Sequence, residues 1–183
     1  MLSAESFWTT SLRAAPEGER LTRIFAAAIN AVASSAAVRR FVQRDGDMLT
    51  ISGREYDLQL FHRVVLLGIG KASIGMADAL VEILGDRLSS GLVIPKYAPP
   101  GSHGPLTVLI GGHPVPDERS LEAGQKTIDL VSSLRTDDLL ICLLSGGGSA
   151  LVTAPVDGVS LADTQVLTSG LLACGARIDE INT

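Results

Sequence analysis

The sequence predicts an α/β fold in which helices cover both faces of a mostly parallel sheet. Short, nearly continuous apolar runs at residues 64–67, 92–94, 106–110 and 139–144 indicate buried strands. Segments with helical spacing separate the first two runs, at 71–84, and the last two, from about Ser120 onward. This alternation is typical of parallel strands joined by crossover helices. No internal repeat and no low-complexity linker interrupts it.

The composition supports one folded domain and argues against several function classes. The 183 residues are 46% hydrophobic with a mean hydropathy of +0.32, enough to bury a sizeable core. A net charge of −5 and a pI near 5.1 argue against a nucleic-acid partner, which would need a basic face. Apolar runs stop short of the ~20 residues that span a bilayer, and no signal-peptide pattern opens the chain. We therefore expect a cytoplasmic protein without a membrane partner.

The remaining elements follow from apolar spacing. A long helix is predicted from Glu17 to about Arg40, with Pro16 ahead of it as a start signal. Residues 48–51 are predicted to form a short edge strand or one arm of a hairpin. Residues 161–174 predict a further helix near the end of the chain.

Several side chains that carry chemistry elsewhere are expected to be structural here. Cys142 and Cys174 lack metal-type spacing and are predicted to be buried free thiols in a reducing compartment. His62 and His103 have no neighbouring partner in sequence and are predicted to be structural or surface residues.

A glycine-rich loop follows the most apolar run of the chain. Residues 144–151 read Leu-Ser-Gly-Gly-Gly-Ser-Ala-Leu. Because glycine has no Cβ, consecutive amide groups can close around an anion. A helix that begins near Ser149 would add the positive end of its dipole. A phosphate cradle is the favoured interpretation, and a turn that only needs unusual dihedrals is the alternative.

Glycine turns end three of the four predicted parallel strands, at 68–70, 111–113 and 145–149. In parallel sheets of this kind, ligands collect outside the carboxyl ends of the strands. If the strands are parallel, the three turns therefore lie along one edge and form a site.

Lys71, one of only three lysines, follows Gly70 at the predicted start of a helix. The helix dipole disfavours an ammonium there unless an anion lies between them, so we expect a phosphate or carboxylate partner. A solvated surface lysine is the alternative. A Walker A loop is excluded by Val65 and Ala72, where glycine and Ser/Thr are required. A dinucleotide fingerprint is excluded by Ser73, where its third glycine would stand.

Residues 111–117 read Gly-Gly-His-Pro-Val-Pro-Asp, and the two prolines stiffen this loop. His113 is placed to contact substrate or act as a general base, or else only to hold its own loop, and both interpretations stay open. Asp117 is expected to cap the following helix rather than bind metal, and Ser120 is a second candidate cap. No carboxylates stand at metal spacing, so the metal ligands are unknown, and no Ser-His-Asp arrangement is supported.

Four strings in this order resemble one known family. They are Gly-Ile-Gly-Lys-Ala at 68–72, Gly-His-Pro-Val-Pro-Asp at 112–117, Ser-Gly-Gly-Gly-Ser-Ala-Leu at 145–151, and Ile-Asn-Thr at 181–183. Together they resemble the N-terminal part of the class II glycerate 2-kinases, whose C-terminal half is the MOFRL domain. Many members carry the label hydroxypyruvate reductase. The resemblance covers nearly the whole chain.

The resemblance implies ATP-dependent phosphorylation of D-glycerate at its 2-hydroxyl, giving 2-phosphoglycerate, with Mg²⁺. It implies two α/β domains with the active site between them, the first a Rossmann-like three-layer sandwich. Residues 1–183 are then expected to be an incomplete N-terminal domain without the MOFRL domain.

The resemblance also implies roles for individual residues. Lys71 is expected to meet phosphate or substrate charge, and His113 is a second candidate catalytic residue without a firm role. The nucleotide phosphates are expected at Gly68, Gly70, Ser145, Gly146, Gly147, Gly148 and Ser149. The implied ligands are glycerate and ATP, and a homodimer is left open.

The sequence departs from the family pattern by ending after Ile-Asn-Thr, where relatives continue into a basic Val-Arg-Lys segment and a further domain. Phosphoryl transfer needs charge neutralisation from several sides, so a chain with one wall of the cleft is expected to be inactive or nearly so. Two alternatives stay open. They are an NAD(P)H-dependent hydroxypyruvate reductase and a non-catalytic module that binds nucleotide or sugar phosphate.

Overall fold

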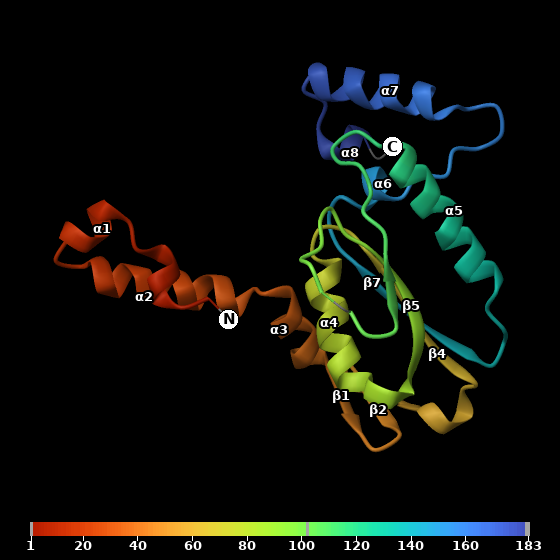
Figure 1. The fold of residues 1–183 in the computed structure, drawn as a ribbon, viewed down its shortest axis with the longest axis horizontal. Helices are drawn as coiled ribbons and strands as arrows, with labels where there is room; N and C mark the ends of the chain where they lie inside the picture. The colour runs from red at the N-terminus through yellow and green to blue at the C-terminus, as the bar shows by residue number, and fades with distance from the viewer. Residues whose placement is uncertain (1, 102, 182–183) are drawn as a thin grey trace.

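The structure is a computed structural model that describes residues 2–101 and 103–181 (Figure 1). In chain order its elements are η1 (Ala4–Phe7), α1 (Thr10–Ala14), α2 (Gly18–Ala31), α3 (Ser34–Phe41), β1 (Val42–Asp45), β2 (Met48–Ile51), β3 (Arg54–Asp57), η2 (Leu58–Leu60), β4 (Arg63–Ile69), α4 (Ser73–Leu84), η3 (Gly85–Arg87), β5 (Leu88–Ile94), β6 (Leu106–Val108), α5 (Glu118–Ser132), β7 (Asp138–Leu144), α6 (Gly148–Leu151), α7 (Leu161–Ala173) and α8 (Ile178–Ile181).

A parallel sheet of four strands lies at the centre, in the order β6-β5-β4-β7. The inner strand β4 is buried from Val64 to Gly68, as its continuous apolar run predicts. Its Leu66 pairs with Gly91 of β5 and Ile141 of β7. The predicted parallel sheet is confirmed, although β6 is shorter than the predicted run at 106–110.

Helices lie on both faces of this sheet, which confirms the predicted three-layer arrangement. On one face, Leu66 and Val93 pack in one apolar cluster with Leu80 of α4. On the other face, Leu67 packs in a second cluster with Ala123 of α5 and with residues of α6. Side chains alternate between the two clusters along β4, as the pleat of a strand requires.

The strands β1, β2 and β3 form a separate antiparallel sheet in that order. Of the two predictions for residues 48–51, the hairpin arm is confirmed, because β2 pairs antiparallel with β1 and β3, and the edge strand is wrong, because β2 is the middle strand. Leu49 of β2 is fully buried against the cluster that contains α4. The short segment therefore extends the core rather than bordering it.

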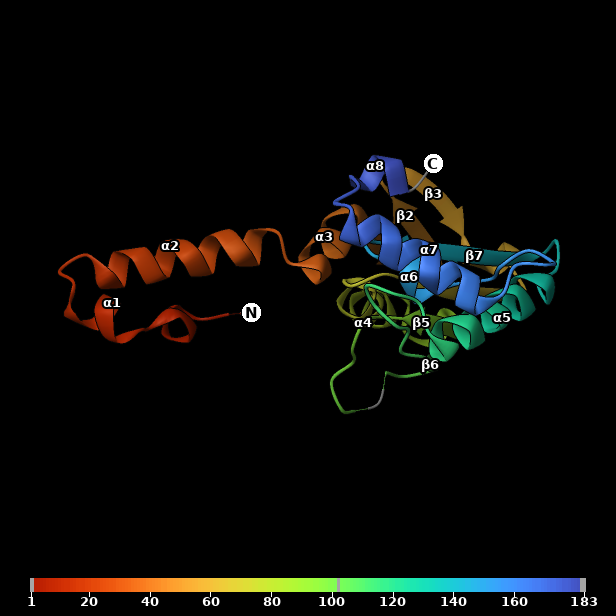
Figure 2. The same cartoon turned by 90° about the horizontal axis from the view of Figure 1, so that it is seen from above.

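The N-terminal region forms an arm that extends away from the body of the molecule (Figures 1 and 2). The single long helix predicted here is divided into α2 and α3, which are bent by 52° at residues 32–33. Phe25 of α2 and Val32, which follows its last residue, are among the exposed apolar side chains. In the described part of the chain, no single helix is long and apolar enough to cross a membrane. The bent pair of α2 and α3 would be long and apolar enough when taken together, by length and composition alone.

The C-terminal region contains α7, which confirms the predicted helix, and the short α8. Cys142 and Cys174 are free as predicted, but both are exposed rather than buried. Cys142 lies on β7, an edge strand of the sheet, and Cys174 follows the last residue of α7. In the Ile-Asn-Thr string, Asn182 and Thr183 lie outside the described residues.

Candidate functional site

The three glycine turns meet at Gly147. A Cβ added to Gly147 would lie 2.9 Å from Cε of Lys71 and 3.0 Å from Nε2 of His113. Lys71 follows β4, His113 follows β6 and Gly147 follows β7, so the three groups come from the ends of three parallel strands. The predicted common edge is therefore confirmed, and a side chain at position 147 would collide with the side chains of Lys71 and His113.

Hydrogen bonds donated by backbone amides hold the turn after β4 against the turn after β7. The Lys71 N–H donates to the carbonyl of Gly146 at 3.0 Å, and the Ala72 N–H donates to Ser145 Oγ at 3.1 Å. The Ser145 N–H donates to the carbonyl of Ile69 at 2.9 Å. These bonds fix the base of Lys71 beside the glycine loop. They also engage the Ser145 hydroxyl within the protein, whereas the sequence assigned it to phosphate.

Gly70 and Gly68 are buried beneath the loops of the site, where they allow close packing of the backbone. Gly70 has φ +116°, a conformation that favours glycine, and a Cβ there would collide with Ser145. Gly68 is buried within β4, and a Cβ there would lie 3.2 Å from the side chain of Val93. Both glycines therefore allow close packing beneath the loops.

The loop after β7 turns sharply at Gly147. This residue is left-handed, with φ +88°, and it is the N-cap of α6. The helix predicted near Ser149 begins at Gly148, and it is only four residues long, so its dipole adds little. Gly146 and Ser149 are exposed, and Gly147 and Gly148 are half-buried, so solvent reaches the loop on this edge of the sheet.

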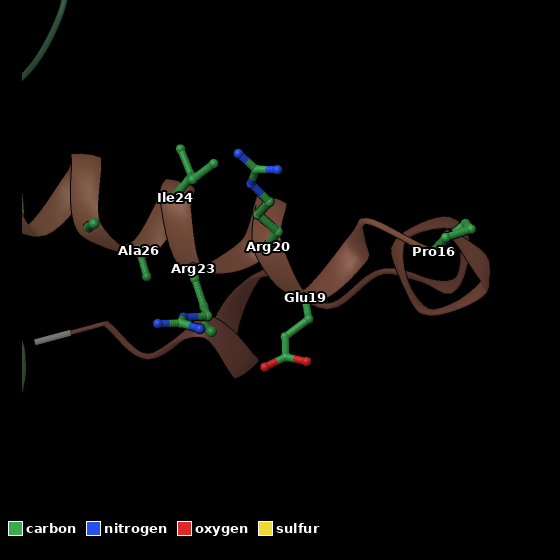
Figure 3. A pocket seen from close by; sticks show the side chains of 8 residues that line it. Pro16, Glu19, Arg20, Arg23, Ile24 and Ala26 are labelled. Carbon is green, nitrogen blue, oxygen red and sulfur yellow. The ribbon is translucent and has the colours of Figure 1, made fainter.

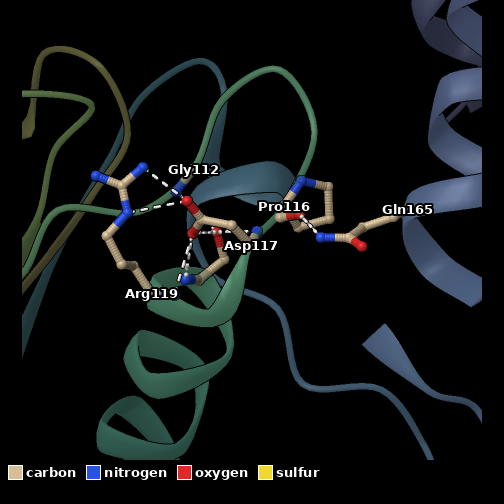
Figure 4. A network of polar contacts seen from close by, with 6 residues as sticks. Gly112, Pro116, Asp117, Arg119 and Gln165 are labelled. Atoms are coloured by element: carbon tan, nitrogen blue, oxygen red, sulfur yellow. Dashed lines mark hydrogen bonds and ion pairs between the residues drawn. The ribbon is translucent and has the colours of Figure 1, made fainter. Parts of the chain in front are cut away.

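The loop that carries His113 is anchored to the start of α5 (Figure 4). The Gly112 N–H donates to the buried Ser120 Oγ at 2.8 Å. Asp117 is the N-cap of α5, as predicted, and accepts hydrogen bonds from the Arg119 and Ser120 amides. Ser120 is not the N-cap. It is the third helical residue and completes the capping box, since its Oγ accepts from the Asp117 N–H.

Asp117 is also held in its charged form. Its ion pair with Arg119, at 2.6 Å, lowers the pKa of the Asp117 carboxyl, and the backbone N–H groups of the helix start add to this effect. The carboxylate is therefore committed to the helix start. Figure 4 also shows Gln165 of α7, whose side chain donates to the carbonyl of Pro116 at 2.9 Å.

His113 occupies an environment that favours the neutral imidazole. Burial lowers the pKa of His113, and the positive charges of Lys71 and Lys96 lower it further. Its Nδ1 is buried and has no hydrogen-bond partner among the described residues. Because Nε2 lies beside the Gly147 turn, this neutral ring faces the same edge as the Lys71 ammonium.

Lys96 is a residue of this edge that the motifs did not point to. It stands two positions after the end of β5, as Lys71 stands two positions after the end of β4. The available signal was its place directly after a strand in a chain with only three lysines.

Metal ligands do not gather at this site. Among the residues that the structure describes, no group of three or more His, Cys, Asp or Glu side chains is arranged to hold a metal ion. A separate hollow lies on the N-terminal arm, lined by residues that include Pro16, Glu19, Arg20 and Arg23 (Figure 3). It lies on η1 and α2, away from the glycine turns (Figure 1), and has no part in the site.

Residues 20–183 match a protein family described as a domain of unknown function, DUF4147. The chain belongs to this family. This match includes all three glycine turns. The resemblance to glycerate 2-kinases found in the sequence is confirmed by the names of related proteins.

A D-glycerate 2-kinase of Thermotoga maritima is 45% identical over 124 residues, covering 66% of this chain and 29% of that protein. A putative hydroxypyruvate reductase of Agrobacterium vitis is 43% identical over 120 residues, covering 66% of this chain and 31% of that protein. The DUF4147 chain therefore spans about a third of the length of the curated relatives it matches.

Two solved structures share the fold. A crystal structure of a Pyrococcus horikoshii protein has a TM-score of 0.74 at 34% identity, covering 85% of this chain and 35% of that one. The crystal structure of a glycerate kinase from Thermotoga maritima has a TM-score of 0.66 at 37% identity, covering 85% of this chain and 34% of that one. The predicted α/β fold class is thus confirmed by both neighbours.

Proposed function

We propose that this chain forms the phosphate-binding wall of a glycerate 2-kinase, which transfers the γ-phosphoryl group of ATP to the 2-hydroxyl of D-glycerate. The observation that carries the proposal is the meeting of Lys71, His113 and the loop at 145–149 around Gly147. The names of the relatives, glycerate kinase in most cases, support the same activity.

The phosphate groups of the nucleotide would lie against the glycine loop. Because Gly147 has no Cβ, the Lys71 and His113 side chains can lie close to the loop, and the amides of the solvent-facing loop supply donors for a phosphate. The Lys71 ammonium beside this space would neutralise charge that develops on the transferred phosphoryl group. Preorganised charge of this kind is usually the largest contribution to phosphoryl transfer.

His113 would accept the proton of the glycerate 2-hydroxyl. A base must be neutral at the working pH, and both burial and the nearby lysines lower the pKa of His113. The same two lysines would keep the ring from holding the proton, so the proton would pass on to solvent.

Mg²⁺ would be bound by the nucleotide phosphates rather than by side chains of the described residues. The described residues contain no cluster of metal ligands, so the carboxylates for Mg²⁺ would come from outside this wall; the matched region is only 29% of the Thermotoga maritima relative. When bound, Mg²⁺ would neutralise charge on the nucleotide phosphates.

The test is phosphorylation of D-glycerate by the full-length protein, measured as formation of 2-phosphoglycerate. Lys71→Met is expected to lower kcat/KM by about 100-fold or more, the usual cost of one transition-state donor. Lys126→Met, on the exposed surface of α5, is the matched control and should leave the rate unchanged. A Lys71→Met protein that retains full activity would remove Lys71 from the mechanism.

The hydroxypyruvate reductase alternative is favoured only by the names of some relatives. A dinucleotide site carries an acidic residue after the second strand to bind the ribose, whereas this chain has Lys96 after β5. Loss of nicotinamide absorbance on addition of hydroxypyruvate to the full-length protein would support the reductase over the kinase.

A further inference from the structure

The end of β5 brings a second lysine, Lys96, to the edge of the sheet that carries Lys71 and His113. The Gly70 N–H donates to the carbonyl of Ile94, the last residue of β5, at 3.1 Å. Pro95 then follows as a fully buried residue, and Lys96 is the first exposed residue beyond it. The backbone that carries Lys96 is therefore fixed beside the turn that carries Lys71.

The charge of Lys96 acts on the same imidazole as the charge of Lys71. Both lysines lower the pKa of His113, after burial, and no carboxylate is among the groups that shift it. The nearest acidic side chain along the chain, Asp117, is paired with Arg119. Neither Lys71 nor Lys96 forms an ion pair with a carboxylate of the described residues.

Two unpaired ammonium groups around a half-buried imidazole make a region of positive potential in a chain whose net charge is −5. Such an arrangement repels itself and is stabilised by an anion bound between its members. Lys71 lies at the glycine loop, where the proposed kinase holds phosphate. β5 and β7 lie on the two sides of β4. Lys96 follows β5, whereas the glycine loop follows β7, so Lys96 and the glycine loop flank the turn that carries Lys71.

We propose that Lys96 binds the carboxylate of the hydroxy-acid acceptor and so selects an anionic substrate over a neutral polyol. The inference rests on the proposed kinase function and adds a specificity residue to it. With the phosphoryl group at Lys71 and the acceptor carboxylate at Lys96, the acceptor hydroxyl would be presented to His113 for removal of its proton.

The kinetic test uses the full-length protein and separates the two substrates. Lys96→Met is expected to raise KM for D-glycerate by about 10- to 100-fold, the usual cost of one charge-assisted hydrogen bond. KM for ATP should stay within about twofold of its original value, since Lys96 is not assigned to phosphate. Lys96→Arg, which keeps the charge, should restore most of the glycerate affinity, and Lys126→Met should match the unaltered protein.

Two kinetic outcomes would overturn the inference. One is an unchanged KM for glycerate in Lys96→Met. The other is a rise confined to KM for ATP, which would place a nucleotide phosphate at Lys96 instead of the acceptor.

A binding test does not depend on turnover. In the 183-residue chain, the imidazole signal of His113 is followed by NMR during pH titrations, with D-glycerate or with uncharged glycerol present. D-glycerate should raise the pKa of His113 and glycerol should not, because only the anion offsets the lysine charges. In Lys96→Met this response to glycerate should be lost, whereas in Lys126→Met it should persist.

The two tests distinguish failure of the inference from failure of the proposed function. A glycerate response at His113 that requires Lys96 supports the inference even if the full-length protein phosphorylates no glycerate. Active kinase with an unaltered KM for glycerate in Lys96→Met refutes the inference and leaves the function standing.

Discussion

Gly147 is the residue at which the proposed phosphate site is most sensitive to a single added carbon. Gly147→Ala places a left-handed residue with a Cβ about 3 Å from the Lys71 and His113 side chains. We expect the free energy of unfolding to fall by about 1–2 kcal/mol from the backbone conformation alone. We also expect weaker ATP binding, measured by calorimetry, because the two side chains must move.

Gly146→Ala is the matched control for this substitution. A Cβ at Gly146 would meet nothing within 4 Å, and its φ lies outside the left-handed region. Chemical denaturation should therefore separate the two variants. Equal stability of Gly147→Ala and Gly146→Ala would contradict the geometry at this turn.

His113 should make stability depend on pH in a defined window. Its pKa is lower in the folded chain than the usual value of about 6.5, so the unfolded chain binds more protons as the pH falls below that value. The contribution of His113 therefore destabilises the fold as pH decreases from about 6.5 toward the folded pKa, and is absent above about 6.5. Urea denaturation at about pH 7.5 and about pH 5.5 should show a smaller pH dependence for His113→Gln.

The lowered pKa of Asp138 makes stability depend on pH in a more acidic range than His113 does. The ion pair with Arg63 lowers the pKa of Asp138 to about 2, and the stability it contributes is lost only as pH falls below about 4. A pH dependence between about 5.5 and about 7.5 that persists unchanged in His113→Gln would show that another group is responsible.

At the scale of single residues, the sequence predicted which motifs meet but not how each side chain is used. Lys71, His113 and Gly147 could be predicted because each follows an apolar strand in a parallel arrangement. The hydroxyl of Ser145 is instead bound to the Ala72 amide, a contact that depends on how two loops pack. Exposure of Cys142 was also unpredictable, because residue type does not reveal that β7 is an edge strand.

At the scale of elements, the start of α5 determines where His113 lies. Ser120 Oγ accepts from the Gly112 and Asp117 amides, and Ser120 is fully buried. Ser120→Ala should lower the free energy of unfolding by about 1–3 kcal/mol, because the buried Gly112 amide loses its partner. It should also reduce kinase activity of the full-length protein, since the loop before His113 is released.

Ser160→Ala tests whether this effect belongs to the loop or to helix capping in general. Ser160 forms the same type of capping box at the start of α7, but there the residues are exposed. It should weaken α7 and leave the His113 imidazole signal unchanged. If both serine substitutions alter that signal equally, the Gly112 contact is not what positions His113.

Element types could largely be predicted from apolar spacing, whereas their ends and partners could not. The strands β4, β5 and β7 follow from continuous apolar runs, and Asp117 was expected as the cap of α5. The break between α2 and α3 carries no glycine or proline, so nothing in the sequence marked it.

At the scale of the whole molecule, the 183-residue chain provides one wall of the proposed cleft. Apolar side chains such as Phe25 of α2 and Val166 of α7 are exposed, which leaves surface for further contacts. We expect this chain alone to bind ATP but to form no 2-phosphoglycerate, because phosphoryl transfer needs charges on several sides of the phosphate. Turnover by the 183-residue chain at the rate of the full-length protein would show that one wall suffices.

The most direct measurement is an amide NMR titration of the isotope-labelled 183-residue chain with ATP. The account predicts that the amide signals of Lys71 and of residues 146–149 shift together, while those of Gly46 and Gly53, in the turns of the antiparallel sheet, stay in place. If ATP leaves the loop signals unmoved, or shifts a different surface first, then the Gly147 turn does not hold phosphate.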